Sequence, residues 1–418
     1  MLVNFSVDNF KLFNSIDFSM KANASISHLK ENYVKNGNRK ILKSAVIFGP
    51  NNSGKSSFIE AIIAMKDIVN GKKLEQIHMM PMMTKKNKNR IIKFKISFYT
   101  KKIFYEFGFS VDFFNKKILN EYLKKGNRFV YKFEKNEIGK VQTGYEDYFD
   151  FLKIFKSDTS LYLSFLKKSE NEFMFPEAFD VYSQFEKIEF INASTKLFPH
   201  KSIELLENGN DKFINGIMKN SDLSIEKLEF DKKTLETLMN HEDDLDVKLG
   251  LKKYFSIKSK HKYKNSDAML SMPFTIMESL GTERLFAFAG EIYYAIKEGK
   301  ILIVDEIDNS FHTIITRNLI NLFHSAEHTE GQLITTTHDL LLLENKYLFR
   351  KDQIWFTEKI DAEGYLYSLD DFTSESGGVR SSKSNLLKKY LENQFGGLPN
   401  VDIVDVLDNL QNGDNHGS

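Results

Sequence analysis

The residues from Gly49 to Ser56 combine glycines, small polar side chains and one lysine, and they fit the pattern G-x-x-x-x-G-K-[ST]. In this pattern the glycines let backbone N–H groups turn toward a phosphate without a Cβ clash, and the lysine reaches the β and γ oxygens. The serine hydroxyl is a ligand for Mg²⁺. A chance Gly-Lys-Ser turn is the alternative, but an apolar run precedes the segment and helical spacing follows it. We therefore predict a nucleoside triphosphate site around Lys55.

A second segment, Ile301 to Glu306, is apolar and ends in two acids. A carboxylate at the end of a buried strand can hold Mg²⁺ directly or through water, which is the role that we expect for Asp305. The next carboxylate, Glu306, could polarise the attacking water as a general base. Strands that end in surface acids are common, so this interpretation depends on the phosphate loop upstream.

Two further segments are weaker when taken alone. Thr335 to Asp339 follows another apolar strand, and His338 could sense a γ-phosphate, although a single histidine in a loop usually has no such role. Glu278 to Arg284 places small residues at the start of a predicted helix, where free N–H groups attract an anion. The same residues fit a capping box, which in isolation is the better interpretation. The order of all four segments favours a single site that hydrolyses a nucleotide.

Strands and helices predicted from the apolar spacing have to position these segments. The expected elements are paired strands in 2–20, a strand over 41–48, a helix directly after the phosphate loop, antiparallel hairpins over 91–133, mainly helical chain over 140–255, strands near 256–277, a helix over 283–298, a strand over 300–304, a helix over 314–324, and strands over 332–336 and 353–358. No internal repeat or long heptad run is visible. This order of elements predicts an α/β fold.

Composition excludes several classes of protein. The 418 residues are 41% hydrophobic and 28% charged, which is typical of a soluble globular chain. The net charge of +1 gives no global attraction to nucleic acid or to anionic membranes, and the absence of cysteine removes disulfides, thiolate metal sites and a cysteine nucleophile. No apolar stretch is long enough to span a bilayer, and the N-terminus lacks a signal-peptide pattern. We therefore expect a cytoplasmic protein without a membrane partner.

Together these segments resemble the cytosolic ABC-type ATPases of prokaryotic anti-phage defence and abortive infection, which are relatives of the SMC and OLD ATPases. This broad group includes the ATPase subunit of the PARIS defence system. The resemblance covers most of residues 1–400 and rests on the segments VDNFKLF, FGPNNSGKSSFIEAI, ESLGTERLF, ILIVDEIDNSFH, TTTHDLLLL, RKDQIWFTEK and KYLENQFGGLPN. It departs from the ABC pattern in two ways, because the signature reads SLGT and not LSGGQ, and because no glutamine stands at a Q-loop position.

The resemblance implies a fold, two cofactors and a set of residues. The fold is an α/β ABC-type P-loop ATPase head, with a mixed sheet and an antiparallel N-terminal lobe, and a mainly helical insertion interrupts it. The domains are then a head over 1–135 and 265–400, an insertion over 136–264 and a flexible tail over 401–418. The cofactors are ATP and Mg²⁺. The residues with implied roles are Lys55, Glu306 and His338 in catalysis, Ser56 and Asp305 at the metal, Gly49, Asn51, Asn52, Ser53, Gly54, Lys55, Ser56, Ser57 and Lys11 at the nucleotide, and Ser279, Gly281 and Thr282 at the nucleotide of a facing subunit.

The expected function is ATP hydrolysis that drives association of the heads into a homodimer or higher homo-oligomer, senses a trigger and controls a separate effector, a nuclease or toxin. Alternatives are an SMC-like DNA-repair or DNA-binding ATPase, a transporter subunit and a nucleotide-gated scaffold. Basic segments at Lys85–Arg90 and Lys258–Lys264 could contact nucleic acid, but solvated surface is their more ordinary role. The strand ending at Glu358 could begin a Toprim nuclease, but the acids required after it are lacking.

Overall fold

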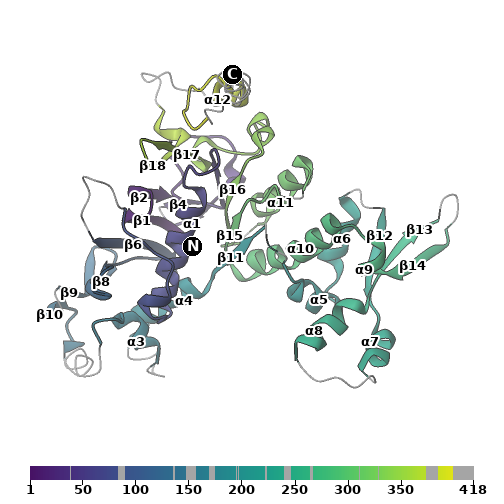
Figure 1. Cartoon of the computed structure of the whole chain (residues 1–418), viewed down its shortest axis with the longest axis horizontal. Coiled ribbons are helices and arrows are strands. Elements are labelled where there is room, and N and C mark those ends of the chain that lie inside the picture. The colour runs from purple at the N-terminus through teal and green to yellow at the C-terminus, as the bar shows by residue number, and fades with distance from the viewer. Residues whose placement is uncertain are drawn as a thin grey trace, which may run out of the picture.

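The computed structural model describes residues 1–37, 39–82, 90–134, 137–146, 157–168, 175–193, 195, 197–221, 224–239, 246–263, 267–309, 311–327, 329–372 and 385–398. These residues form a body around one large sheet and a smaller lobe that projects from it (Figure 1). The predicted α/β class is confirmed. Within the ranges given, no helix has the length and apolarity that crossing a bilayer requires. The tail predicted over 401–418 lies outside the described residues.

The large sheet contains thirteen strands in the described part of the chain. Their spatial order is β10 (Glu137–Val141), β9 (Arg128–Glu134), β8 (Lys117–Lys125), β7 (Ile103–Asp112), β6 (Ile91–Thr100), β1 (Leu2–Phe10), β2 (Phe13–Ser19), β18 (Glu363–Ser368), β17 (Ile354–Ile360), β5 (Ser44–Phe48), β16 (Gln332–Thr337), β15 (Ile301–Asp305) and β11 (Ile188–Asn192). Neighbours from β10 to β2 are antiparallel, and those from β17 to β11 are parallel. The hairpin of β17 and β18 joins the two halves, because β18 also pairs with β2. The expected antiparallel lobe and mixed sheet are thus one continuous sheet.

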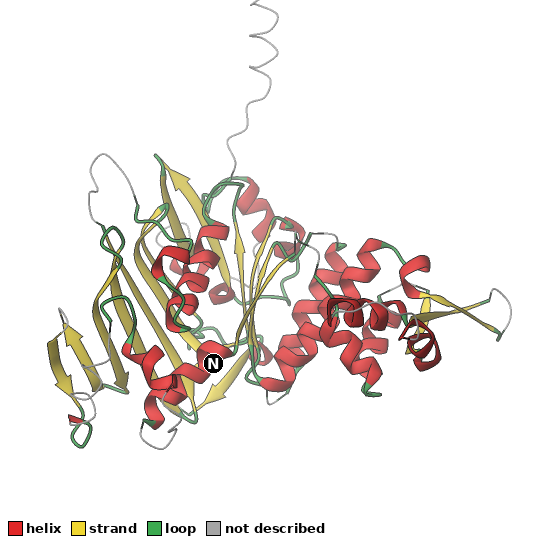
Figure 2. Cartoon of the chain, turned by 60° about the horizontal axis from the view of Figure 1, so that its bottom comes forward, coloured by secondary structure: helices red, strands yellow, loops and turns green. Residues whose placement is uncertain are grey.

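Helices cover both faces of this sheet, so the parallel strands β5, β15 and β16 are buried along their whole length. One face packs against α1 (Lys55–Val69), α3 (Tyr162–Lys168) and α4 (Pro176–Glu186), and the other against α10 (Leu280–Glu298), α11 (Thr313–Ser325) and α12 (Leu386–Leu391). Figure 2 shows helices packed against the strands of the sheet. Along β5, Ala45 and Ile47 join the core beside α1, whereas Val46 and Phe48 join the core beside α10 and α11.

The projecting lobe combines helices with a small antiparallel sheet. Its elements are α5 (His200–Glu207), α6 (Lys212–Asn220), β12 (Ile225–Phe230), α7 (Lys232–Met239), α8 (Asp246–Phe255), β13 (Ile257–Lys262), β14 (Met269–Pro273), α9 (Phe274–Met277) and the first part of α10. The remaining elements are a hairpin of β3 (Tyr33–Asn36) and β4 (Arg39–Leu42), and short 3₁₀ helices at Lys30–Asn32, Leu74–Gln76, Leu340–Glu344, Lys351–Gln353 and Leu369–Asp371.

The segment expected to form a separate helical insertion also contributes to the large sheet. Strand β11 lies inside that segment, yet it pairs in parallel with β15, and α4 packs on the sheet beside α1. The sequence did not indicate β11 because this edge strand has only two buried apolar side chains, Ile188 and Ile191. The strand expected over 41–48 is divided at Lys43, whose ammonium donates to the carbonyl oxygens of His324 and Ala326 at 2.8 Å each. The division into domains stays a prediction.

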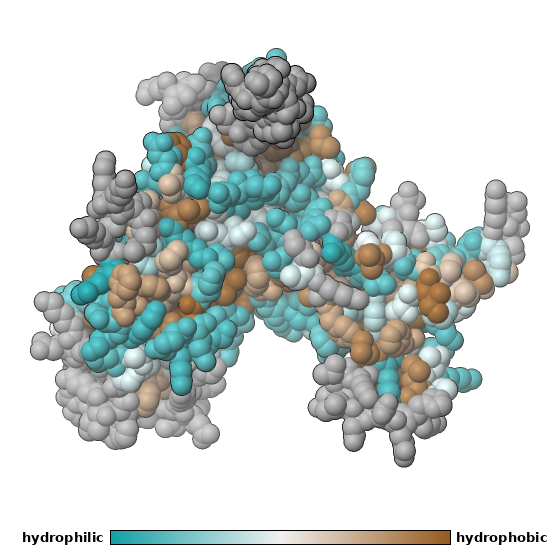
Figure 3. Space-filling view, viewed as in Figure 1, coloured by the Kyte–Doolittle hydropathy of each residue, from teal (hydrophilic) through white to brown (hydrophobic). Residues whose placement is uncertain are grey.

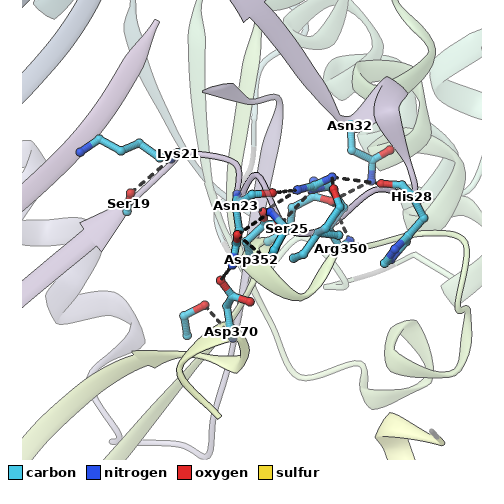
Figure 4. Close-up of polar contacts among 12 residues, drawn as sticks. Ser19, Lys21, Asn23, Ser25, His28, Asn32, Arg350, Asp352 and Asp370 are labelled. Atoms are coloured by element: carbon cyan, nitrogen blue, oxygen red, sulfur yellow. Dashed lines mark hydrogen bonds and ion pairs between the residues drawn. The ribbon is translucent and has the colours of Figure 1, made fainter. Parts of the chain in front are cut away.

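A buried arginine stabilises the ends of β5 and β17 that lie opposite the phosphate loop (Figure 4). Arg350 has no exposed surface, and its Nε and Nη2 donate to the carboxylate of Asp352 at 2.9 and 2.8 Å. Its remaining N–H groups donate to backbone carbonyl oxygens in the loop between β2 and β3, which belong to Asn23, Ile26 and His28. One side chain therefore ties this early loop to the segment that begins β17.

Gln353 extends this cluster to the first residue of β5. Its Oε1 accepts from the backbone N–H of Arg350 at 2.9 Å and from Asn32 Nδ2 at 2.7 Å, and its Nε2 donates to the Ser44 carbonyl oxygen at 3.1 Å. Ser44 begins the strand whose other end leads into the phosphate loop. The cluster therefore fixes β5 at one end, and the nucleotide segments occupy the opposite end.

We expect Arg350→Leu to lower the free energy of unfolding by about 3–5 kcal/mol, because Asp352 would be left as an uncompensated buried charge. Urea denaturation followed by circular dichroism measures this change. Lys388→Ala is the control, since Lys388 forms an exposed pair with Glu392 at 3.7 Å and its loss should cost less than about 1 kcal/mol. Equal effects of the two substitutions would contradict a central role for the arginine.

Candidate functional site

The phosphate loop connects the end of β5 to the start of α1, as predicted, and its conformation requires glycine. Gly54 has φ 114°, and a Cβ there would lie 2.5 Å from the ring of Phe13. A Cβ on Gly49 would lie 2.2 Å from Oγ1 of Thr357. The phosphate loop therefore packs directly on β2 and β17. A side chain at Gly49 or Gly54 would not fit between the loop and these strands. Of the other predicted loop residues, Ser53 is buried, Ser57 is half-buried, and Asn51, Asn52 and Ser56 are exposed.

Lys55 is buried at the first position of α1, with 6% of its surface exposed. Its Nζ donates to the carbonyl oxygens of Gly49 at 2.6 Å and Pro50 at 2.9 Å. Burial lowers the pKa of Lys55 from 10.5 to about 8, although the charges of Asp305 and Glu306 act in the opposite direction. The ammonium is thus held by the loop itself, at the position where a triphosphate would supply stronger acceptors.

The acidic segment meets the phosphate loop through Asp305. Its Oδ2 accepts from the hydroxyl of Ser56 at 3.0 Å, and its Oδ1 accepts from the hydroxyl of Thr336 at 2.5 Å. Thr336 Oγ1 also accepts from the backbone N–H of Glu306 at 2.8 Å. Glu306 has a left-handed backbone with φ 57°, which is unusual for a residue other than glycine. The structure therefore brings Lys55, Ser56 and both acids together from distant parts of the sequence.

His338 lies beside the second acid, at the end of β16. Its Nε2 is 3.9 Å from Glu306 Oε1, and both side chains are 36% exposed. The backbone N–H of His338 donates to both carboxylate oxygens of Asp308 at 3.2 Å. Burial and the nearby charge of Lys55 lower the pKa of His338 below its usual 6.5, although the charges of Asp308 and Glu306 act in the opposite direction, and this shift favours the neutral imidazole. A neutral ring can carry one proton on either nitrogen and accept at the other.

Four predicted residues make other contacts in this chain. Ser279, Gly281 and Thr282 lie in the projecting lobe where α9 leads into α10, apart from α1 (Figure 1). Ser279 Oγ accepts from the backbone N–H of Thr282 at 3.3 Å, so it caps α10, as the alternative interpretation of this segment expected. Lys11 lies in the turn between β1 and β2 and pairs with Glu60 of α1 at 2.5 Å. The roles of these four residues at a nucleotide stay predictions.

A family model matches residues 44–344, from the start of β5 to the 3₁₀ helix after His338, and its description is "AAA domain, putative AbiEii toxin, Type IV TA system". The chain belongs to this family. The match includes the phosphate loop, both acids and His338, so the protein contains a P-loop ATPase domain.

Several solved structures are similar to this AAA-family chain at low identity, and no curated protein matches it. One is the SMC head domain from Thermotoga maritima, with 12% identity and a TM-score of 0.41 over 88% of this chain and 98% of that chain. Another is an SMC head bound to the C-winged helix domain of ScpA, with 13% identity and a TM-score of 0.41 over 88% and 97% of the two chains. A third is an SMC head with an extended coiled coil bound to the C-terminal domain of ScpA, derived from Pyrococcus furiosus, with 12% identity and a TM-score of 0.41 over 94% and 98%.

The sequence did not identify three residues that shape the site of this AAA-family protein. Phe13 and Thr357 support the phosphate loop, and Thr336 contacts both acids. The signal for Thr336 was present, because Thr335, Thr336 and Thr337 occupy a strand in which all six residues are buried. Hydroxyls in a buried strand need hydrogen-bond partners. Phe13 and Thr357 gave no such signal, since they meet the loop only through the tertiary fold.

The lowered pKa of Lys55 predicts a pH dependence of nucleotide binding. Above pH 8 the free lysine is mostly neutral, and a bound triphosphate raises its pKa, so binding takes up a proton. We therefore expect the affinity for ATP to fall by up to about tenfold per pH unit above pH 8. Titration calorimetry at pH 7.5 to 9.5, in buffers of different ionisation enthalpy, measures both the affinity and the proton uptake. Lys55→Arg is the control, because arginine stays charged, and an equally steep decline in that variant would assign the effect to another group.

Proposed function

We propose that this protein is a Mg²⁺-dependent ATPase whose ATP-bound heads associate and control a separate effector in anti-phage defence by abortive infection. The junction of Lys55, Ser56, Asp305 and Glu306 is the observation that supports hydrolysis. It combines a cation for the phosphates, a hydroxyl and a carboxylate for a metal, and a second carboxylate for water. Each of these is a recurring part of phosphoryl-transfer sites in P-loop proteins.

The donor set at this junction fits Mg²⁺. Mg²⁺ is usually held by one or two carboxylates together with substrate phosphates and water. Ser56 Oγ and Asp305 Oδ2 lie 3.0 Å apart beside the phosphate loop, and they would hold the ion. When bound, the ion would neutralise charge on the β and γ oxygens.

Residues of this chain supply the other roles in the proposed reaction. Lys55 exchanges its two loop carbonyls for phosphate oxygens, and the N-terminus of α1 points its positive end at the same phosphates. Glu306 takes the proton of the attacking water as general base. His338, beside Glu306, can donate from Nε2 to the γ-phosphate while its backbone is held by Asp308. Phe13 and Thr357 pack against the loop and support its backbone.

A second copy of the chain would complete the site. The predicted signature, Ser279 to Thr282, lies in the projecting lobe, and apolar side chains beside it are exposed: Ile276 by 75%, Leu280 by 74% and Met277 by 43%. Figure 3 shows apolar atoms on the surface of this lobe. Exposed apolar surface of this kind is typical of an interaction site. In a two-fold dimer the signature of one protomer would face the phosphate loop of its partner.

The proposed effector is a separate nuclease or toxin. The description of the family names a putative toxin of a type IV toxin–antitoxin system, which supports a role in controlled toxicity. The likeness to the ATPase subunit of PARIS rests on the sequence segments alone and belongs to this proposal. If the chain is itself the toxic component, expressing it without its genetic neighbours will arrest growth.

Direct binding of nucleic acid has less support. On β13, Lys258 pairs with Asp231, Lys260 with Glu229 at 2.8 Å and Lys262 with Asp267 at 3.0 Å. These pairs neutralise the basic stretch and favour a solvated strand face. Arg90 pairs with Asp112 at 3.2 Å, whereas residues 85–89 and Lys264 lie outside the described residues.

Glu306→Gln should bind ATP but stop its cleavage, because an amide cannot accept the proton of water. Phosphate release should fall to background, and light scattering should detect a stable ATP-bound dimer or higher assembly. Lys55→Ala is the matched control, since it should bind little ATP and stay unassembled. Each variant is also co-expressed with the neighbouring gene products to test control of the effector. The amount of effector that copurifies should differ between Glu306→Gln and Lys55→Ala. Normal hydrolysis by Glu306→Gln would remove Glu306 as the base, and equal effector binding by both variants would refute nucleotide control.

A mixture of two inactive variants tests the composite site. Ser279→Arg should bind ATP normally but fail to hydrolyse it, because a bulky cation replaces a small hydroxyl at the interface. Mixed with Lys55→Ala, it can form a dimer in which one intact phosphate loop faces one intact signature. We expect partial recovery of ATPase activity in the mixture. If Ser279→Arg alone hydrolyses ATP at the wild-type rate, the cap of α10 is the whole role of Ser279.

A further inference from the structure

We propose that Thr336 is a positioning residue that orients both acids of the site at once, an inference that rests on the proposed ATPase function. Thr336 lies on β16, has no exposed surface and is two residues before His338. Its single hydroxyl touches the side chain of Asp305 and the backbone of Glu306.

The geometry fixes the direction of both hydrogen bonds. A backbone N–H can only donate, so Thr336 Oγ1 accepts from Glu306 at 2.8 Å. A hydroxyl has one proton to donate, and the carboxylate oxygen Oδ1 of Asp305 lies at 2.5 Å to receive it. The proton of the hydroxyl and one of its lone pairs are therefore engaged between the two acids, and the side chain has no exposed surface.

Each contact has a separate consequence. With Oδ1 held by Thr336, the other oxygen of Asp305 is directed at Ser56, which is the side on which the proposed metal would lie. The contact to the Glu306 N–H stabilises the left-handed backbone at φ 57°, and this conformation decides where the proposed base points. Thr336 thus couples the orientation of the proposed metal ligand to that of the proposed base.

The test compares Thr336→Val with Thr335→Val. Valine has nearly the shape of threonine but cannot form either hydrogen bond, and residues that orient metal ligands typically change metal affinity or activity by about 10–100-fold. Thr335 is equally buried on the same strand, but its hydroxyl donates to the carbonyl oxygen of Val304 at 2.9 Å and contacts neither acid. Thr336→Ser keeps the hydroxyl and should restore most of the wild-type behaviour.

The main measurement is the Mg²⁺ concentration that half-saturates binding of a fluorescent, non-hydrolysable ATP analogue to the full-length protein. For Thr336→Val we expect this concentration to rise by about 10–100-fold, with a similar fall in kcat and little change in the binding of the analogue at saturating Mg²⁺. Thr335→Val should show wild-type Mg²⁺ dependence. Thermal unfolding of both variants measures the structural cost of losing a buried hydroxyl.

Two results would overturn the proposal: a wild-type Mg²⁺ dependence in Thr336→Val, or the same rise in Thr335→Val, which would make the effect one of strand stability. A wild-type protein that binds the analogue without any dependence on Mg²⁺ would also refute it. A wild-type protein that binds with Mg²⁺ but does not hydrolyse ATP would refute only the proposed function, because the Mg²⁺ titration would still measure the contribution of Thr336.

Discussion

The parallel pairing of β5, β16 and β15 is the constraint on which the rest of the site depends. Parallel strands present their carboxyl ends at one edge of a sheet, which is where α/β proteins bind ligands. Here those three ends carry the phosphate loop, His338 and the acidic pair. The register aligns Ile47 with Thr336 and Val304 with Thr335. A shift of one residue would turn every side chain to the opposite face and separate Thr336 from Asp305.

The sequence alone was sufficient to predict the segments that match common phosphate-binding motifs. The sequence predicts Gly49 to Ser56, Asp305, Glu306 and His338 at the ends of strands, and the structure brings these ends to one edge of the sheet. The strands that carry them were also predictable, because β5 and β15 are short, mostly apolar runs buried on both faces. Strand β16 is buried as well, although only Leu333 and Ile334 in it are apolar.

The contacts that the sequence could not supply are those made between distant, chemically ordinary residues. Phe13 is one apolar residue among many, and only the folded sheet places its ring beneath Gly54. Arg350 and Asp352 stand close in the sequence, but nothing there indicates that the loop of Asn23 completes their cluster. Ser279 fits both a helix cap and an interface residue, and one chain shows only the cap because the other role requires a second protomer.

The order of the strands in the sheet has a consequence for synthesis of the protein on the ribosome. Strand β5, which begins at Ser44, lies between β16 and β17, and these are made about three hundred residues later. At the usual rate of 5–20 residues per second, the chain waits roughly 15–60 s for these neighbours. Until β17 emerges, the phosphate loop lacks Thr357 and β5 lacks the anchor at Gln353. The antiparallel strands β1, β2 and β6 to β9 can pair with one another meanwhile, so the phosphate loop gains its full support only late in synthesis.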